Sequence, residues 1–109
     1  MNLPTEVFGN VVVVHTPEEF GEDQADAFAA SVRALDRSNV VVDLDRTEML
    51  DSAGLTALLD VQDELRGRGG GMKIATTNAT NRKILEITRL DHQLEVFDSM
   101  IDAVKSFQP

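Results

Sequence analysis

The sequence lacks three residue types altogether: its 109 residues include no cysteine, tryptophan or tyrosine. Without cysteine the chain can form no disulfide framework, thiolate metal site or prenylation anchor. This fits a cytoplasmic protein, and we expect neither a metal nor a cofactor. Without tryptophan and tyrosine the chain also lacks the usual aromatic platforms for single-stranded nucleic acid.

Basic residues and long apolar runs are scarce as well. Ten Lys and Arg stand against 19 Asp and Glu, which gives a net charge of −9, and the basic residues are scattered. Because phosphate backbones and anionic membrane surfaces bind clustered Lys and Arg, we expect no nucleic-acid and no membrane partner. The longest aliphatic run is the VVVV at 11–14, too short to cross a bilayer, and MNLPTEVFGN at the start does not resemble a secretory signal.

The residues that are present predict one small folded domain spanning 1–109. The sequence is 42% hydrophobic and 27% charged, enough for one modest core and a well-solvated surface. The hydrophobic pattern alternates between the periods of strands and helices. It predicts strands at 5–8, 11–14, 40–44, 72–76 and 94–97, helices at 22–35 and 53–66, a short helix capped by Asn78 or Thr80, and a C-terminal helix opened by Ser99.

Strands that alternate with helices predict an α/β fold with a mostly parallel sheet. Segment 5–8 can pair with 11–14 across the turn at Gly9-Asn10, and 11–14 is either an edge strand or a covered central one. Loops that follow parallel strands lie at the carboxyl edge of the sheet, where α/β proteins carry function. One such loop contains Asp51 and Ser52.

The simplest role for Ser52 is a helix cap, which stabilises a helix by about 0.5–2 kcal/mol. Three features go beyond a cap. Asp51 and Ser52 are adjacent although one cap suffices, and Gly54 in the first helical turn costs about 1 kcal/mol relative to alanine, which would leave the backbone open to close approach by another molecule. In addition, Met49 and Leu50 are apolar residues in an expected loop and could form a contact surface.

Two enzymatic or signalling alternatives fit poorly. A serine hydrolase needs glycine two residues before its nucleophile, where this chain has Leu50, and His15 and His92 are single and far apart in sequence. A phosphorelay receiver needs a lysine after its last strand, whereas Lys105 lies in the expected C-terminal helix. A phosphorylation switch fits better: a phosphate on Ser52 would add about −1.5 to −2 charges at a helix N-terminus, beside Asp51.

The segment from Val40 to Val104, VVVDLDRTEMLDSAGLTALLDVQDELRGRGGGMKIATTNATNRKILEITRLDHQLEVFDSMIDAV, resembles the STAS domain of bacterial anti-sigma-factor antagonists. The resemblance rests on the Asp-Ser-x-Gly-Leu motif that begins at Asp51, on the Gly-Gly before the next strand and on the final Phe-Asp-Ser at 97–99. It implies a small mixed, mostly parallel sheet with helices packed chiefly on one side. It further implies that Ser52 is phosphorylated by an ATP-dependent anti-sigma kinase and reset by a serine phosphatase.

Two departures from the family pattern stand out. Members usually carry a Gly-Glu-Leu-Asp-like turn after the second strand, beside the serine loop; here Pro17 stands near the glycine and Glu18 can keep the acidic place. Arg89 stands where a helix-ending glycine is common, so either Arg89 is left-handed or the helix ends differently.

The sequence thus predicts an anti-sigma-factor antagonist, not an enzyme, that binds its kinase through a bare Ser52 and is released when Ser52 is phosphorylated. Leu55 could be either a contact or a core residue. The main alternative is a STAS module that is never phosphorylated and serves as a scaffold or accessory subunit of a larger assembly, such as a lipid transporter or a stress-sensing complex. The residues expected to contact the partner are Glu18, Met49, Leu50, Asp51, Ala53 and Gly54.

Overall fold

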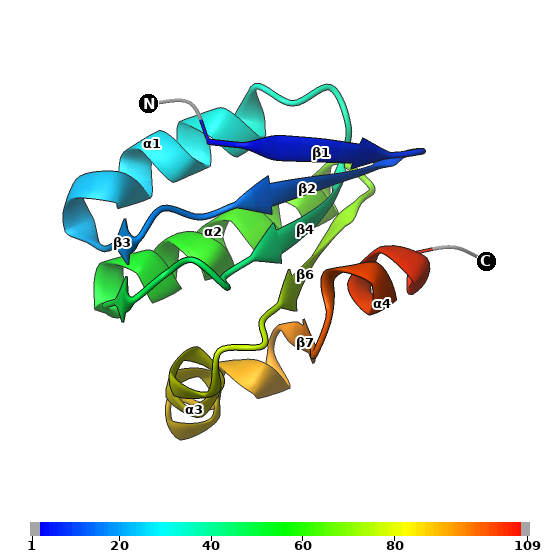
Figure 1. Cartoon of the computed structure of the whole chain (residues 1–109). Helices are drawn as coiled ribbons and strands as arrows, with labels where there is room; N and C mark the ends of the chain where they lie inside the picture. The colour runs from blue at the N-terminus through cyan, green and yellow to red at the C-terminus, as the bar shows by residue number, and fades with distance from the viewer. Residues whose placement is uncertain (1–2, 108–109) are drawn as a thin grey trace.

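The computed structural model describes residues 3–107, in which strands alternate with helices (Figure 1). Its main sheet has the strand order β1-β2-β4-β6-β7, and β1 alone runs antiparallel to its neighbour. This confirms the predicted mixed, mostly parallel sheet. The strands are β1 (Thr5–Phe8), β2 (Val11–His15), β4 (Asn39–Asp43), β6 (Gly71–Ala75) and β7 (Glu95–Phe97), and a separate ribbon consists of β3 (Glu19–Phe20) and β5 (Met49–Leu50).

The hairpin of β1 and β2 forms as predicted, with Phe8 opposite Val11. Gly9 turns the chain with a φ of +62°, a left-handed conformation that glycine adopts without a Cβ penalty. Strand β2 lies between β1 and β4, so the four valines at 11–14 form a covered strand and not an edge, each at most 2% exposed.

Helices follow the strands at nearly the predicted positions. Helix α1 ends two residues before the predicted Leu35, and α2 begins at Ser52 instead of Ala53, the usual uncertainty at helix ends. None of the helices within 3–107 is both long and apolar enough to cross a membrane. The helices are α1 (Glu22–Arg33), α2 (Ser52–Gly67), α3 (Ala79–Ile87) and α4 (Met100–Lys105), with a 3-10 turn at Leu90–His92.

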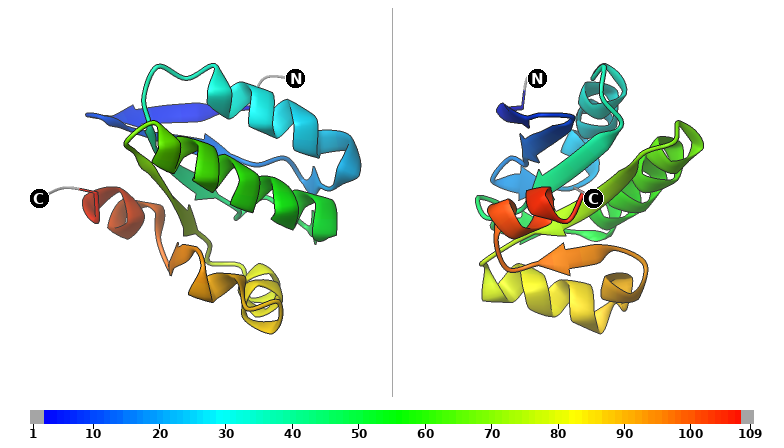
Figure 2. Two further views of the ribbon diagram at one scale, coloured as in Figure 1. Left: turned by 180° about the vertical axis from the view of Figure 1, so that it is seen from behind. Right: turned by 90° about the vertical axis from the view of Figure 1, so that its right-hand side faces the viewer.

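The helices pack chiefly on one face of the sheet, as predicted (Figure 2). Successive strand residues point to opposite faces, so Val12 and Val42 belong to the core shared with α1, α2 and α3, whereas Val11 and Val13 belong to the core shared with α4. Both faces are therefore covered, which explains the continuous apolar strands. In α2 the structure buries Val61 and leaves Leu59 partly exposed.

The helix ends settle two open points. Asn78, and not Thr80, caps α3, because its Oδ1 accepts the N–H groups of Thr80 and Asn81 at 2.9 and 3.1 Å. After α3, Arg89 has a φ of 61° and is left-handed. The chain thus keeps the turn that a glycine would make, with the steric cost of a side chain there.

Candidate functional site

Asp51 is the residue that caps α2. Its Oδ1 accepts hydrogen bonds from the N–H of Ala53 at 2.9 Å and of Gly54 at 3.1 Å, and its backbone is extended, as an N-cap requires. Ser52 is then the first residue of the helix, with an exposed side chain. Because Asp51 satisfies the helix N-terminus, the Ser52 hydroxyl is not needed for the cap.

The ribbon of β3 and β5 brings two loops together beside Ser52. Glu19 pairs with Met49 and Phe20 with Leu50, and the carbonyl of Glu18 accepts the N–H groups of Glu48 and Met49 at 2.8 and 3.1 Å. The prediction that Met49 and Leu50 lie in a loop is therefore wrong: they form a strand, because the segment after β2 supplies its partner. The juxtaposition expected from the STAS resemblance, loop 16–21 beside the serine loop, is confirmed.

Gly54 requires a correction. It is buried, and a Cβ at this position would overlap the backbone carbonyl of Phe20, while a Cβ at Gly21 would meet the carboxylate of Asp51. The close approach that Gly54 permits is therefore made by the protein's own ribbon against α2, and not by another molecule. The sequence showed the need for glycine but not which segment required it.

A buried network of polar side chains connects the loop after β2 to the loop after β4 and to α3. The Thr16 and Thr47 hydroxyls are hydrogen-bonded to each other, and Thr47 Oγ1 also lies 2.7 Å from the carbonyl of Pro17. The side-chain amide of Asn81 donates to the carbonyls of Leu44 and Thr47 at 3.1 and 2.8 Å. Sequence reasoning missed these residues, since Thr16 and Thr47 look like ordinary loop residues and Asn81 like an ordinary helix residue.

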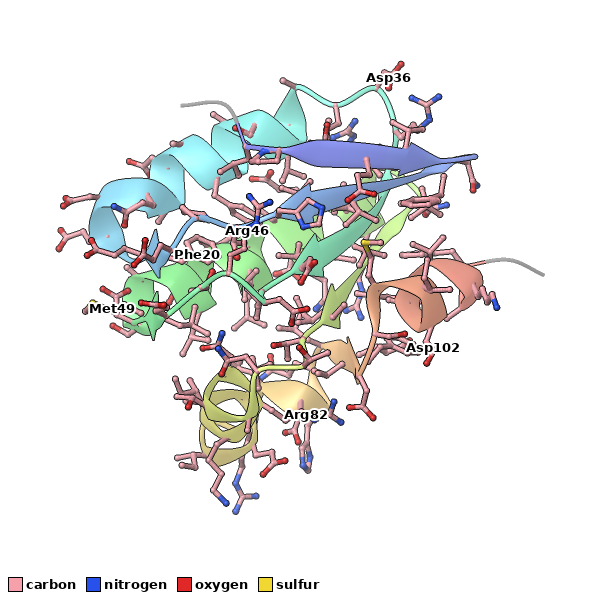
Figure 3. All side chains as sticks on the ribbon, viewed as in Figure 1. Phe20, Asp36, Arg46, Met49, Arg82 and Asp102 are labelled. Carbon is pink, nitrogen blue, oxygen red and sulfur yellow. The ribbon has the colours of Figure 1, made fainter. Side chains whose placement is uncertain are left out.

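The predicted contact residues lie at one end of the molecule, and all of them except Gly54 are at least partly exposed. Met49 is 63% exposed at the tip of the ribbon, near Phe20 and the start of α2 (Figure 3). Glu18, Asp51 and Ser52 are also exposed, and Leu50 and Ala53 are half-buried. Only Gly54 is buried, and Leu55, the ambiguous residue, proves to be a core residue at 9% exposure.

Ser52 lines a groove between α1 and α2, which we call the interhelical groove. Its walls include Ala25, Ala29, Ala53 and Ala57, and its volume is about 340 Å³. Small side chains let another molecule approach the helix backbones closely. The groove also contains acidic side chains, and its complete lining is Ala25, Asp26, Ala29, Arg33, Ser52, Ala53, Thr56, Ala57 and Asp60.

A second groove, which we call the acidic groove, is lined by Asp51 but not by Ser52. It has a volume of about 510 Å³ and combines apolar with acidic side chains. Phe20, Met49, Leu50 and Ile84 supply the apolar surface. The carboxylates along it come from the ribbon and from the starts of α1 and α2: Glu19, Glu22, Asp23, Glu48 and Asp51.

The single arginine of the interhelical groove is already engaged. Arg33 Nε and Nη2 donate to the two carboxylate oxygens of Glu64 at 2.8 and 2.7 Å, a bidentate pair between the ends of α1 and α2. This hydrogen bonding lowers the pKa of the Glu64 carboxyl and raises the pKa of the Arg33 guanidinium. The groove therefore offers no uncommitted cation from its own lining to an anion at Ser52.

Neither histidine lies near Ser52. His15 Nε2 is 2.7 Å from Glu6 Oε1 and its Nδ1 is 3.0 Å from Asp43 Oδ2, so both ring nitrogens are occupied across β1, β2 and β4. His92 belongs to the 3-10 turn, and neither residue lines either groove. Within 3–107 no group of three or more His, Asp or Glu is placed to hold a metal ion.

Solved structures with the same fold include bacterial regulators and part of a mammalian transporter. An anti-sigma factor antagonist from Mycobacterium paratuberculosis superposes with a TM-score of 0.87 at 23% identity, over 99% of this chain and 94% of that one. The Bacillus cell-fate determinant SpoIIAA in its phosphorylated form gives 0.72 at 17% identity, over 97% and 99%. A murine solute carrier 26 anion transporter gives 0.73 at 16% identity, over 91% of this chain but 18% of the transporter.

At these identities the structural likeness shows the fold alone. No curated protein matches the sequence. The sequence model of the STAS domain, however, matches residues 2–103, nearly the whole chain. The mostly parallel sheet and the helix that begins after Asp51 agree with this match. The chain therefore belongs to the STAS domain family.

Proposed function

We propose that this protein is a cytoplasmic anti-sigma-factor antagonist that works by partner switching. Ser52 is the phosphoacceptor; the bare serine surface binds an anti-sigma factor with serine kinase activity, and a serine phosphatase restores it. The observation that carries the proposal is the division of labour at the start of α2, where Asp51 makes both cap bonds and the Ser52 side chain is exposed. A modification there leaves the helix cap intact.

A phosphate on Ser52 would act locally. The first turn of a helix attracts anions through its N–H groups, but Asp51 already accepts two of them, and Asp26 and Asp60 line the same groove. Arg33 is held by Glu64. The added charge therefore finds no cation in the groove, so it stays solvated and blocks a partner that packs closely against Ala53 and Ala57. Release needs no refolding.

The protein acts in this scheme as a substrate and a binding module rather than a catalyst. Ser52 has no histidine beside it that could activate it, because His15 is held between Glu6 and Asp43. Partner contacts are assigned to Glu18, Met49, Leu50, Asp51 and Ala53. Gly54 is left out because it is buried.

A second function is favoured by one observation: the same fold forms 18% of an anion transporter chain. In that alternative the domain is a scaffold or accessory subunit and Ser52 is never modified. The two functions differ in the fate of the Ser52 hydroxyl, which can be measured directly.

The deciding experiment is intact-protein mass spectrometry after incubation with ATP, magnesium and lysate of the host. We expect one phosphate-sized mass gain that disappears in Ser52→Ala. Thr56→Ala is the matched control, because Thr56 is an exposed hydroxyl one turn further along α2 and lines the same groove, and it should leave the gain in place. No gain with a demonstrably active lysate, or a gain that only Thr56→Ala removes, would overturn the proposal.

A further inference from the structure

Within 3–107 large apolar side chains are exposed at few places, and one of them, Met49, lines the acidic groove. Within 3–107 the most exposed large hydrophobic residues are Ile87 at 70% and Met49 at 63%. Met49 lines the groove, and so does Ile84 on α3. Ile87 follows Ile84 by three residues and so lies next to it along the helix surface. Together they make an apolar strip from the ribbon to α3.

The carboxylates beside this strip are not committed to partners inside the protein. Glu19, Glu22, Asp23 and Glu48 form no ion pair with any residue in 3–107, and no Lys, Arg or His lines the groove. Asp51 is used only as the cap of α2. By contrast, Glu64, Glu95 and Asp98 lie within ion-pair distance of Arg33, Lys73 and Arg82. At this groove, free acidic charge therefore lies beside exposed apolar surface.

We propose that the acidic groove binds a segment of a partner protein that carries apolar side chains between arginines or lysines. The apolar side chains would cover Met49, Leu50 and Ile84, and the basic ones would meet the carboxylates of Glu19, Glu22 and Glu48. Nucleic acid, an anionic membrane and a second copy of this chain all bring negative charge and would be repelled. The proposal deepens the proposed function by giving the chemistry of the partner, and it rests on that function only for the identity of the partner.

This groove is distinct from the one that Ser52 lines. The phosphate of the proposed switch acts in the interhelical groove, among Ala53, Asp26 and Asp60. The acidic groove is lined by Asp51 and by Ile84 of α3, and it shares no lining residue with the interhelical groove. The partner thus has two contacts: one that phosphorylation blocks and one that supplies orientation and charge selection.

The test uses a defined probe and the intact protein. The probe is a fluorescent amphipathic peptide of about 15 residues with leucines at helical spacing flanked by arginines, and a second peptide carries glutamates in place of the arginines. By fluorescence anisotropy we expect the arginine peptide to bind at least about tenfold more tightly, and its affinity to fall as salt rises, because exposed charges are screened. Amide NMR shifts should map to 48–51 and 84–87.

Matched variants locate the site. Met49→Ser and Ile87→Ser remove exposed side chains and should each weaken peptide binding by about fivefold or more. Ile101→Ser is the control, since Ile101 is 45% exposed on α4, away from the groove, and it should bind as the wild type does. The proposal is overturned by no preference for the arginine peptide, by NMR shifts elsewhere, or by equal effects of Ile87→Ser and Ile101→Ser.

Failure here is distinguishable from failure of the proposed function. Peptide binding requires no kinase or phosphate, whereas the mass gain at Ser52 requires no peptide. If the peptide does not bind but the mass gain at Ser52 is observed, the proposed switch stands and only the proposal of a basic partner segment is wrong.

Discussion

The two ends of the α1–α2 pair differ in whether their acidic side chains are paired with basic ones. Where both helices begin, Glu22, Asp23 and Asp51 lie together along the acidic groove with no cation in its lining. Where they end, Arg33 and Glu64 form a bidentate ion pair. The same two helices therefore present an uncompensated acidic surface at one end and a neutralised one at the other.

Helix electrostatics explains part of this difference. Negative charge is stabilised near a helix N-terminus and positive charge near the C-terminus, so Glu22 and Asp23 suit the first turn of α1 and Arg33 its last turn. Glu19 and Glu48 lie outside the helices, on or beside the ribbon, and gain nothing from this effect. They lie beside exposed Met49, where the proposed partner segment would bring its basic side chains.

The largest effect on the Ser52 end should come from Gly54→Ala. The added Cβ would overlap the carbonyl of Phe20, which is backbone and cannot move aside without breaking the contact between ribbon and α2. We expect a loss of about 2–3 kcal/mol of unfolding free energy, measured by urea denaturation. Gly67→Ala is the control: nothing lies within 4 Å of its Cβ position, so it should be neutral or slightly stabilising. Equal stability of the two variants would contradict the close approach.

A half-buried cation at the opposite face, Lys73, provides the next test. Lys73 Nζ donates to Ser106 O at 3.1 Å and to Ser106 Oγ at 2.8 Å, and lies 4.3 Å from the centre of the Phe107 ring. Lys73→Ala removes these contacts at the end of α4 and should cost about 1–2 kcal/mol in the same urea experiment.

Lys83 is the matched control for Lys73. It pairs with Glu86 at 4.0 Å but is 70% exposed, so Lys83→Ala should change stability by no more than about 0.5 kcal/mol. Comparable losses for Lys73→Ala and Lys83→Ala would mean that burial does not distinguish the two cations.

The smallest expected effect is on the pH dependence of the unfolding free energy. Because the hydrogen bond with Arg33 lowers the pKa of the Glu64 carboxyl, the pair stabilises the fold above the ordinary carboxyl pKa, and this is lost as pH falls through the lowered pKa. Glu64→Gln should therefore flatten the acid side of the stability curve slightly, in thermal melts at a series of pH values. Asp63→Asn should leave the curve unchanged, because Asp63 is exposed and forms no ion pair with any residue of 3–107. A similar flattening there would rule out the Arg33–Glu64 pair as the cause.

Several features of the fold and site could be predicted from local sequence. The β-branched runs and the helical spacing placed every strand of the main sheet and every helix to within a few residues, since periodicity reflects burial directly. Capping chemistry correctly placed a helix start after Ser99, and it placed the other two starts to within a residue or two, where the structure assigns the caps to Asp51 and Asn78. The STAS resemblance rested on the same local motif.

What the sequence by itself determined is the alternation of strands and helices, the acidic surface and the exposed Ser52 at a helix start, because these depend on residues close together in the chain. Only the tertiary structure decided that Met49 and Leu50 form a strand, that Gly54 serves Phe20 and not a partner, and that Ile84 joins the acidic groove. The physical reason is that each of these contacts joins segments 30 or more residues apart, and no local preference encodes which distant backbone will arrive there.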